Sequence, residues 1–491
     1  MMNQTTFNTL KAQGYSYIPL VFELLADFDT PLSLYLKLAN APLSYLLESA
    51  VHEERFGRYS FIGLPCDSYL TVRDEVIKIY EGHRCIQQHR GNALNFIDSF
   101  FESFKIPEIP GFECFSGGLV GYLGYETIRY IEERLTPNIQ AIGLDIPDIF
   151  LLVSKEVVIV DNFAGKLYLV IYAKSDDVNA YAKAKDKLNK IRQQLRQPLN
   201  IPLSLGLVKS GWEYEVSEDI FKEGVKRIVD YIRAGDCMQV VLSRKIFYDY
   251  KTEPISLYRA LRTINPSPFL IFYHFRDFVV VGSSPEVLLR KVKERLIVRP
   301  LAGTRKRGID AQEDLLYAQE LLSDEKERAE HTMLIDLGRN DLGRVSKPGT
   351  VKITRKMAIE RYSHVMHIVS EVESEIRPEV SPMQAFAAVF PAGTLSGAPK
   401  IRAMEILQEL EPSRRGVYGG ALGYLSFSGD MDWAIGIRTA VIKDQKAVIQ
   451  VGAGIVADSH PKTELEETTN KAMALIKALK LVEHGLDGEI D

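Results

Sequence analysis

Cysteine is scarce in this chain, and its four cysteines lie far apart. Cys66, Cys85, Cys114 and Cys237 show no CxxC spacing within 491 residues. This spacing excludes a zinc site built from cysteine pairs and argues against a disulfide framework. It fits a protein of the reducing cytoplasm, which is the location that we expect.

An excess of one charge and long apolar runs are also lacking. The 60 lysines and arginines nearly balance the 65 aspartates and glutamates, so we expect no nucleic-acid partner. The most apolar stretch, DIFLLVSKEVVIV, is short and contains Lys155, which excludes a membrane span. The first residues, MMNQTTFNTLKAQG, lack a basic region followed by an apolar core, so we expect no secretory signal.

The length of the chain and one turn-rich stretch predict two lobes. A chain of 491 residues exceeds the size at which a single core stops growing. The stretch from Pro198 to Gly211 is rich in proline, glycine and serine and low in charge, and we place the boundary there. We therefore expect an N-terminal lobe over residues 1–200 and a C-terminal catalytic domain over residues 212–491.

Strand-like and helix-like segments occur in both parts. The N-terminal part has strand-rich runs at 67–82 and 155–173, the second with a hairpin signal, and a helical run at 176–197. The strands expected in the C-terminal part are 269–275, 278–284, 417–428 and 447–457. The helices expected there are 217–235, 310–337, 382–390, 399–410 and a last one from Thr463. Long antiparallel hairpins with helices between them predict an α+β fold.

Two acidic pairs with helical spacing are the most informative feature of the sequence. Glu327 and Glu330 lie in DEKERAEH, and Glu464 and Glu467 lie in KTELEETTNKA. Residues three apart on a helix share a face, so each pair can aim two carboxylates at one point. Four convergent carboxylates suit Mg²⁺, which takes one or two of them directly. Either pair alone has a structural explanation, because acidic residues in a first turn stabilise a helix by about 0.3–1 kcal/mol.

The last expected helix also carries a capping-box pattern. Thr463 is the expected N-cap, and Glu466 lies three residues further along the chain. A structural role in capping the helix then accounts for the presence of Glu466, but not for that of its neighbours Glu464 and Glu467.

Glycine-rich segments between the acidic pairs favour anion binding over nucleotide binding. GAGIVA, at residues 452–457, formally matches GxGxxA, but no helix follows the glycines directly. We interpret it as a tight turn that offers backbone N–H groups to a carboxylate. GTLSGAPK resembles a P-loop but lacks its Gly-Lys-Ser/Thr ending, so we expect no nucleotide.

Four further residues are candidates for acid–base chemistry or anion binding. Arg438 in AIGIRTA is a cation inside an expected apolar strand, where a substrate carboxylate is a natural partner. Glu286 follows a strand end, where both active-site acids and ordinary solvated acids occur. His367 lies in a partly apolar run in which a histidine is more often structural. Tyr418 is equally explained as a core aromatic. Together the motifs indicate a Mg²⁺-dependent enzyme acting on a small carboxylated substrate.

The motifs, in this order, resemble those of the chorismate-utilising enzymes and, among them, the anthranilate synthase component I family. The resemblance runs from about residue 40 to about residue 475. It is carried by LLESAVHEERFGRYS with FIGLP, NPSPF, SSPE, RPLAGTR, EHTMLIDLGRNDLGRV, RYSHVMH, FPAGTLSGAPK, YGGALGY and GAGIVADS. It implies a two-lobed fold in which large antiparallel sheets pack as a sandwich with helices outside.

The resemblance also implies roles for individual residues. Mg²⁺ would be bound through Glu330 and Glu467, with Glu327 and Glu464 assisting mainly through water. Chorismate, whose ring carboxylate would complete the metal shell, would be held by Gly303, Thr304, Thr394, Lys400, Tyr418, Arg438, Gly452, Ala453 and Gly454. The implied catalytic residues are Glu286 as general acid, His367 as base or orienting group, and Thr304.

The reaction implied is the conversion of chorismate and ammonia into anthranilate and pyruvate in tryptophan biosynthesis. Related isochorismate and salicylate enzymes carry a lysine where Gln239 stands, and aminodeoxychorismate synthases often carry one where Ala302 stands. Neither lysine is present here. The runner-up is aminodeoxychorismate synthase component I, and the alternative from another class is a non-catalytic, tryptophan-binding regulatory protein.

The resemblance further implies a protein partner and an inhibitor. No glutaminase segment is visible, so ammonia would come from a separate glutamine amidotransferase subunit, in a heterotetramer. Tryptophan would inhibit from a feedback site separate from the catalytic pocket. The residues that resemble this site are Leu47, Glu48 and Ser49 of LLES, and Pro268, Phe269 and Leu270 of NPSPFL.

Overall fold

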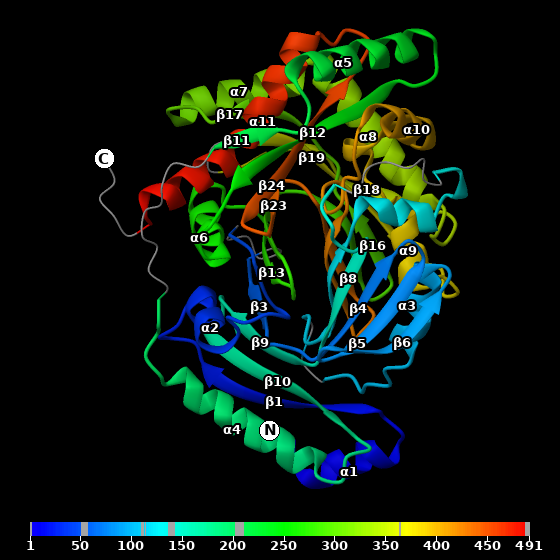
Figure 1. Ribbon diagram of the computed structural model, residues 1–491. Helices are drawn as coiled ribbons and strands as arrows, with labels where there is room; N and C mark the ends of the chain where they lie inside the picture. Colours follow the sequence, from blue (N-terminus) through cyan, green and yellow to red (C-terminus); the bar gives the residue numbers. More distant parts are fainter. Residues whose placement is uncertain are drawn as a thin grey trace.

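The chain forms two large antiparallel sheets that are stacked face to face, with helices on their outer faces (Figure 1). The computed structural model describes residues 2–50, 57–109, 112, 114–135, 143–201, 211–362 and 365–486. This arrangement confirms the expected α+β sandwich.

The first sheet combines strands from both parts of the chain. In spatial order these are β1 (Tyr17–Leu25), β10 (Lys166–Lys174), β9 (Glu156–Asp161), β3 (Tyr59–Gly63), β2 (Ser44–Glu48), β13 (Phe269–His274), β14 (Val279–Ser284), β23 (Thr439–Lys443), β24 (Lys446–Ile455), β12 (Gln239–Asp249) and β11 (Trp212–Tyr214), with β20 (Gly397–Ala398) paired to β12. The pairing of β2 with β13, which sets Leu46 opposite Phe272, joins the two parts. The expected hairpin at 155–173 is confirmed as β9 and β10.

The second sheet is built in the same mixed way. Its order is β17 (Leu301–Lys306), β19 (Val365–Glu375), β16 (Arg295–Val298), β15 (Val287–Val292), β22 (Met431–Ile435), β21 (Ala421–Ser426), β7 (Gly118–Leu123), β8 (Ile149–Ser154), β4 (Ser68–Arg73), β5 (Val76–Glu81) and β6 (Arg84–Arg90), with β18 (Lys352–Arg361) paired to β19. The division at residues 200–212 therefore coincides with no break in either sheet. Residues 202–210 of that stretch lie outside the described residues.

Helices cover the outer face of each sheet. The first sheet is covered by α1 (Gln4–Ala12), α2 (Pro31–Leu38), α4 (Ala180–Leu195), α6 (Pro254–Ile264) and α11 (Pro461–His484). The second is covered by α3 (Ala93–Glu102), α8 (Glu325–Gly343) and α9 (Pro382–Val389), and by the short helices η1 (Tyr125–Tyr130), η2 (Glu133–Leu135) and η3 (Gly393–Leu395). Three more helices pack near the strand ends: α5 (Glu218–Arg233), α7 (Ala311–Ser323) and α10 (Lys400–Leu410).

Successive side chains of a strand point to opposite faces of the sheet, and this assigns each one to a layer. On β2, Tyr45 and Leu47 face the second sheet, whereas Leu46 faces the helices. The layer between the sheets is rich in aromatic rings, among them the fully buried Tyr122 and Phe275, whose ring centroids lie 5.5 Å apart. The sheets are thereby held together by a core to which both parts of the chain contribute.

The helix expected over residues 310–337 is two helices that break at Asp324. This residue ends α7 in an extended conformation, and its side chain accepts hydrogen bonds from the N–H groups of Lys326 and Glu327. Continuous apolar spacing concealed the break, because an aspartate that caps a new helix also reads as an ordinary exposed helix residue. The break places Glu327 and Glu330 at the beginning of α8.

The last helix begins earlier than expected, and its capping box is wrong. It starts at Pro461 with His460 as N-cap, and no side chain caps it. Proline is favoured in the first turn because its fixed φ suits the helix and its missing N–H needs no partner. Thr463 lies inside the helix, and Glu466 is exposed there.

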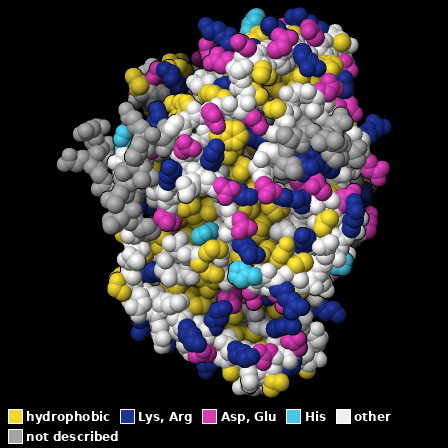
Figure 2. Space-filling view, viewed as in Figure 1, with side chains coloured by type: hydrophobic (Ala, Val, Ile, Leu, Met, Phe, Trp, Pro, Cys, Tyr) yellow, Lys and Arg dark blue, Asp and Glu magenta, His cyan; other side chains and the backbone are white. Residues whose placement is uncertain are grey.

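The surface fits the charge balance of the sequence. Figure 2 shows basic and acidic side chains interspersed across the visible face. Over the part of the chain that the structure describes, no helix combines the length and apolar character needed to cross a bilayer. The cytoplasmic location stays a prediction.

Candidate active site

The candidate site is built around two adjacent connections at which the chain passes from one sheet to the other. Glu286 lies between β14 of the first sheet and β15 of the second, and Arg438 lies between β22 of the second sheet and β23 of the first. The connections are bonded together: the Ile435 N–H donates to the Glu286 carbonyl at 3.0 Å, and the Ser283 N–H donates to the Arg438 carbonyl at 3.1 Å. Residues about 150 positions apart in the sequence therefore share one wall.

Glu286 is a buried acid held in its protonated form. Glu286 is 6% exposed, and this burial raises the carboxyl pKa to about 8. The Thr394 hydroxyl donates to Glu286 Oε1 at 3.1 Å, and together with the positive charges of Arg438 and Lys471 it opposes the shift only in part. A carboxyl group that keeps its proton near neutral pH is suited to act as a general acid.

His367 lies opposite Thr304 across the β17–β19 pair, and its ring is anchored through Nδ1. This nitrogen lies 3.0 Å from the Gly303 carbonyl and 3.0 Å from Thr304 Oγ1. A carbonyl oxygen only accepts, so Nδ1 carries the hydrogen. Burial lowers the pKa of His367 to about 4, so the ring is neutral and Nε2 keeps a lone pair that can accept a proton.

Gly303 explains why these two side chains meet. It lies at a bulge in β17 with a φ of +68°, a left-handed conformation that favours glycine. A Cβ atom at this position would lie 3.1 Å from Glu327 Oε2. The glycine therefore brings the β17 backbone against the acidic pair of α8 and aims Thr304 at His367.

Arg438 is a half-buried cation that has no carboxylate partner among the described residues. It does not lie inside a strand, as expected, but directly before β23 with a left-handed φ of +51°. Its guanidinium donates to the Asn265 amide oxygen at 3.3 Å, and burial lowers its pKa. A cation left in this state is costly, which favours an anionic ligand beside it.

The glycine turn expected at residues 452–457 is wrong, because residues 452–455 lie within β24, which confirms the strand expected over residues 447–457. Gly452 pairs with Ser243 of β12 and Gly454 pairs with Val241. The two glycines allow other side chains to come close to the β24 backbone. A Cβ atom at Gly452 would lie 2.7 Å from the Tyr418 hydroxyl, and one at Gly454 would lie 2.7 Å from Gln239 Nε2. Residues two apart in a strand share a face, so this one face of β24 admits a ligand or a long side chain only because glycine is present. Tyr418 follows α10 in a turn rather than a strand, and it is buried.

Glu327 and Glu464 lie in the first turns of α8 and α11, where the helix dipoles favour carboxylates, and Glu330 and Glu467 lie three residues further along the same helices. The charges of Glu467 and Lys326 both act on Glu464, so the beginnings of the two helices are neighbours. Burial first, and then the neighbouring carboxylate, raises the pKa of Glu464. Among the described residues no three histidines, cysteines or acids converge closely enough to hold a metal.

The donor set nevertheless fits a hard cation. Glu464 Oε2 is buried and has no hydrogen-bond partner. Glu467 is paired with Lys471 at 2.7 Å, and Glu327 with Arg305 at 3.3 Å, so internal cations neutralise carboxylates that a divalent ion would otherwise take. Oxygen ligands of this kind are those that Mg²⁺ prefers.

Two residues that were predicted to bind substrate are hydrogen-bonded to other protein groups instead. Lys400 donates to Asp341 at 3.0 Å and to the Val389 carbonyl at 3.3 Å, which ties α10 to α8 and α9. Thr394 is used to hold Glu286. The remaining predicted catalytic and substrate residues lie around the two sheet connections and β24.

A second cavity, of about 290 Å³, lies between the sheets and is separate from these residues. All six residues predicted from LLES and NPSPFL line it. The side chain of Glu48 accepts hydrogen bonds from Tyr258 and Arg262 of α6, on the helix side of the sheet. Glu48 therefore lines the cavity with its backbone and not with its carboxylate. The opposite wall comes from the second sheet and includes Tyr424, Met431 and Asp432.

Sequence reasoning missed three residues that matter for these sites. Lys471 lies four residues after Glu467 and donates to the Gly452 carbonyl at 3.0 Å. Asn265 belongs to NPSPF but bonds Arg438 of the catalytic wall. Asp432 lines the second cavity and is paired through Oδ2 with Arg290 at 3.5 Å. Of these, only Lys471 had a sequence signal, its i, i+4 spacing from an acidic residue.

A family model described as "chorismate binding enzyme" matches residues 49–477, most of the chain. The chain belongs to the chorismate binding enzyme family. It is therefore an enzyme, and the resemblance drawn from its motifs is confirmed.

Relatives named "Anthranilate synthase component 1" match along their whole length. The one from Neisseria meningitidis serogroup A is 55% identical over 490 residues, covering 99% of this chain and 100% of the relative. The one from Pseudomonas aeruginosa is 52% identical over 494 residues, with the same coverage. These relatives confirm the similarity to component I within the family.

Solved structures agree with the fold. The crystal structure of anthranilate synthase component I from Streptococcus pneumoniae has a TM-score of 0.78 and 34% identity, over 92% of this chain and 98% of that one. The menaquinone-specific isochorismate synthase of Escherichia coli has a TM-score of 0.72 over 97% of this chain. At 17% identity, it shows the shared fold alone.

Proposed function

We propose that the chain is the chorismate-converting component of anthranilate synthase, which forms anthranilate and pyruvate from chorismate and ammonia. The observation that carries the proposal is the buried, protonated Glu286 beside Arg438, which has no carboxylate partner among the described residues. The first group can give a proton to a departing hydroxyl, and the second can bind a carboxylate of the substrate. The full-length similarity to relatives named component 1 supports the same reaction.

In the proposed mechanism, Arg438 and backbone N–H groups near Gly452 orient chorismate. Glu286 donates its proton to the 4-hydroxyl as the C–O bond breaks, so water leaves and ammonia adds at C2. His367 accepts the C2 proton, or orients the ring for its loss, as pyruvate is eliminated. Mg²⁺ would be held by Glu330 and Glu467, with Glu327 and Glu464 assisting, and would stabilise charge at the ring carboxylate.

Two positions support ammonia, rather than water or an enzyme lysine, as the nucleophile. Gln239 donates an amide N–H to Glu330 at 3.3 Å, and an amide cannot take a proton from water. Ala302 is an apolar, buried residue of β17 and offers no covalent nucleophile. Ammonia is nucleophilic without activation. This favours anthranilate synthase over aminodeoxychorismate synthase component I, and the buried, protonated Glu286 disfavours a non-catalytic tryptophan-binding protein.

The isolated chain is expected to make anthranilate from chorismate, Mg²⁺ and an ammonium salt at alkaline pH, where NH₃ is abundant. Anthranilate fluorescence measures the product directly. Glutamine should support the reaction only after a glutamine amidotransferase subunit is added, which tests the proposed partner and heterotetramer. Aminodeoxychorismate, isochorismate or salicylate as the main product would show that the branch is wrongly assigned.

We also propose that tryptophan inhibits the enzyme from the cavity between the sheets. At about 290 Å³ the cavity is close to the lower limit for small-molecule pockets, about 300 Å³. Phe269, Pro268 and Tyr424 offer an apolar wall for an indole. Asp432, which lines the cavity and is paired with Arg290 at 3.5 Å, offers a negative charge to an ammonium group.

A short connection supports coupling between this cavity and the catalytic wall. Pro268, Phe269 and Leu270 line the cavity, and Asn265 of the same NPSPF motif holds Arg438. A ligand that shifts this segment would change the position of Arg438. Because such coupling is reciprocal, tryptophan and chorismate should weaken each other's binding by the same factor.

Replacing Ser49 by phenylalanine is expected to relieve tryptophan inhibition while leaving uninhibited turnover within about twofold. The bulky ring would fill cavity space that the indole needs, and Ser49 lies outside the catalytic wall. Titration of activity with tryptophan measures the effect. Ser99→Phe, on the exposed side of α3, is the matched control and should keep normal inhibition. A flat tryptophan response in the wild-type enzyme, stripped of bound tryptophan, would refute the feedback site.

A further inference from the structure

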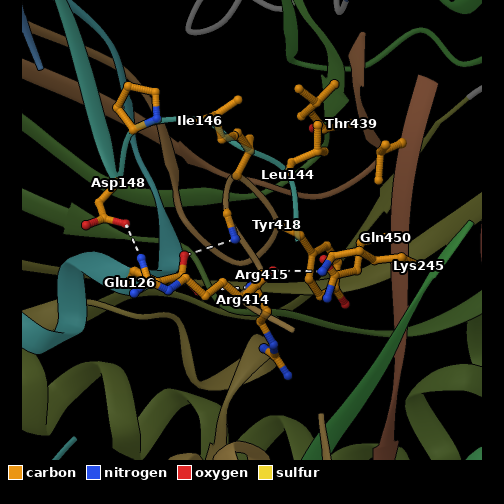
Figure 3. Close-up of a pocket in the computed structure, with 15 residues that line it drawn as sticks. Glu126, Leu144, Ile146, Asp148, Lys245, Arg414, Arg415, Tyr418, Thr439 and Gln450 are labelled. Carbon is orange, nitrogen blue, oxygen red and sulfur yellow. Dashed lines mark hydrogen bonds and ion pairs between the residues drawn. The ribbon is translucent and has the colours of Figure 1, made fainter. Parts of the chain in front are cut away.

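Arg415 is a buried cation behind the catalytic wall, in the connection between α10 and β21. It is 4% exposed, and the same connection contains Tyr418 of the catalytic wall. In Figure 3 this segment lies between Glu126 on one side and Lys245 on the other. The Glu126 carboxylate accepts the Arg415 N–H at 2.8 Å, and Lys245 donates to the Arg414 carbonyl at 2.7 Å. The backbone that carries Arg415 is therefore held from both sides.

The Arg415 guanidinium donates hydrogen bonds to three separate segments of the chain. Nε and Nη2 donate to the two carboxylate oxygens of Glu411, at the end of α10, both at 2.7 Å. Nη1 donates to the Leu395 carbonyl of η3 at 2.6 Å, and Nη2 donates to the Val241 carbonyl of β12 at 2.8 Å. A planar guanidinium fixes the direction of each of these bonds as well as its length.

Aromatic rings complete the surroundings of this guanidinium. The ring centroids of Tyr125 and Tyr418 lie 4.5 and 5.5 Å from its central carbon. A buried ion pair such as that of Arg415 with Glu411 contributes little net stability, because the desolvation of both charges offsets their attraction. The arrangement provides a fixed geometry instead.

Two of the bonds reach the segment that holds the general acid. Leu395 is the last residue of η3 and follows Thr394, whose hydroxyl donates to Glu286 Oε1 at 3.1 Å. The Val241 N–H donates to the carbonyl of Ser396, the next residue of this segment, at 3.0 Å. The guanidinium therefore bonds η3 directly and also bonds the β12 residue to which the end of η3 is attached.

We propose that Arg415 is a positioning residue for the reaction: its guanidinium holds η3 so that the Thr394 hydroxyl stays directed at the carboxyl group of Glu286. The inference rests on the proposed function, in which Glu286 is the general acid. A general acid must point its proton at the departing hydroxyl, and a displacement of about 1 Å can lower a rate by about 100-fold. Arg415 itself is buried beside Tyr418 and acts through these neighbours.

A double-mutant cycle between Arg415→Lys and Thr394→Val tests the inference. Lysine keeps the charge beside Glu411, but one ammonium group cannot span both Glu411 and the Leu395 carbonyl, and valine removes the Thr394 hydroxyl. Each single variant should lower kcat by about tenfold, the usual contribution of one hydrogen bond, and the double variant should also be about tenfold slower. A double variant that is about 100-fold slower would show two independent effects and overturn the inference. Measuring kcat at saturating chorismate keeps changes in binding through Tyr418 out of the comparison.

Lys37→Met is the matched control for the loss of a buried ion pair by itself. Lys37 of α2 donates to Asp29 at 2.8 Å and to the Leu195 carbonyl at 3.2 Å, on the helix side of the first sheet. This variant should melt below the wild type and keep the wild-type kcat of the folded enzyme. An equal fall of kcat in Lys37→Met and Arg415→Lys would reduce Arg415 to a stabilising residue.

A crystal structure of Arg415→Lys adds a measurement that does not depend on the reaction. We expect the Thr394 hydroxyl to lie more than about 3.5 Å from the Glu286 carboxyl in this variant. An intact bond there would refute the role of Arg415, even with anthranilate as the product. If the wild-type chain forms no anthranilate, the proposed function fails, and the crystal structure still decides whether Arg415 holds η3. If Arg415→Lys does not fold, Glu411→Gln, which removes the charge that orients the guanidinium, replaces it in both measurements.

Discussion

Replacing Glu330 or Glu467 by glutamine is expected to abolish measurable turnover and to weaken Mg²⁺ binding by more than about 100-fold. Each substitution keeps the side-chain volume but removes a negative charge from the place where α8 and α11 begin. The proposed ion depends on these charges, because neutral amides are weaker ligands for a hard cation. Isothermal calorimetry with Mg²⁺ and the anthranilate fluorescence assay measure the two effects separately.

Glu466→Gln is the matched control on the same helix turn. Glu466 is exposed, and the capping box that would have given it a structural role does not form. This variant should bind Mg²⁺, turn over substrate and melt as the wild type does. If both Glu330→Gln and Glu467→Gln bind Mg²⁺ with wild-type affinity, the metal assignment is wrong, whatever their activity.

Replacing Glu286 by glutamine is expected to lower kcat by about 10²–10⁴-fold, the usual contribution of a general acid, with a much smaller change in KM. Glutamine keeps the hydrogen bond from Thr394 but has no acidic proton to give. Single-turnover kinetics should show that the chemical step is slowed. A variant that retains more than about a tenth of wild-type kcat would remove Glu286 from the proton-transfer role.

The raised pKa of Glu286 predicts two pH effects with definite signs. With the amidotransferase and glutamine supplying ammonia, activity should fall as pH rises through about 8, because Glu286 then loses the proton it must donate. The folded state also keeps this proton when the unfolded chain, with a carboxyl pKa near 4.5, has lost it. The burial of Glu286 therefore lowers stability progressively from about pH 4.5 to about pH 8.

The Glu286→Gln variant isolates the stability effect. Across that window the wild type should lose stability relative to the variant, and the difference should level off above pH 8. Thermal or urea unfolding of both proteins at several pH values measures it. A difference that stays constant between pH 5 and pH 8 would show that the carboxyl titrates normally.

Features of short range could be predicted from the sequence. Short apolar runs predicted strands such as β13 and β14, and helical spacing predicted α5, α9 and the acidic pairs of α8 and α11. Both kinds of pattern depend only on neighbours along the chain. The order of the motifs was specific enough to indicate the family, which the comparisons confirm.

Local patterns failed where the deciding partner is far away in sequence. Arg438 lies outside a strand, and its carbonyl accepts a hydrogen bond from the N–H of the remote Ser283. Gly452 and Gly454 could also be interpreted as a turn. Pairing with β12 holds them in a strand, and Tyr418 and Gln239 occupy the space that glycine leaves free.

The sequence by itself determined which residue types carry the chemistry and how each acidic pair is spaced. Only the tertiary structure decided that Glu286 and Arg438 meet, because two separate connections between the sheets are bonded side by side. The same holds for the pKa of Glu286, since burial by distant segments raises it. It holds also for the cavity between the sheets, whose far wall comes from residues 422–432. Convergence and desolvation are properties of packing, which no local pattern encodes.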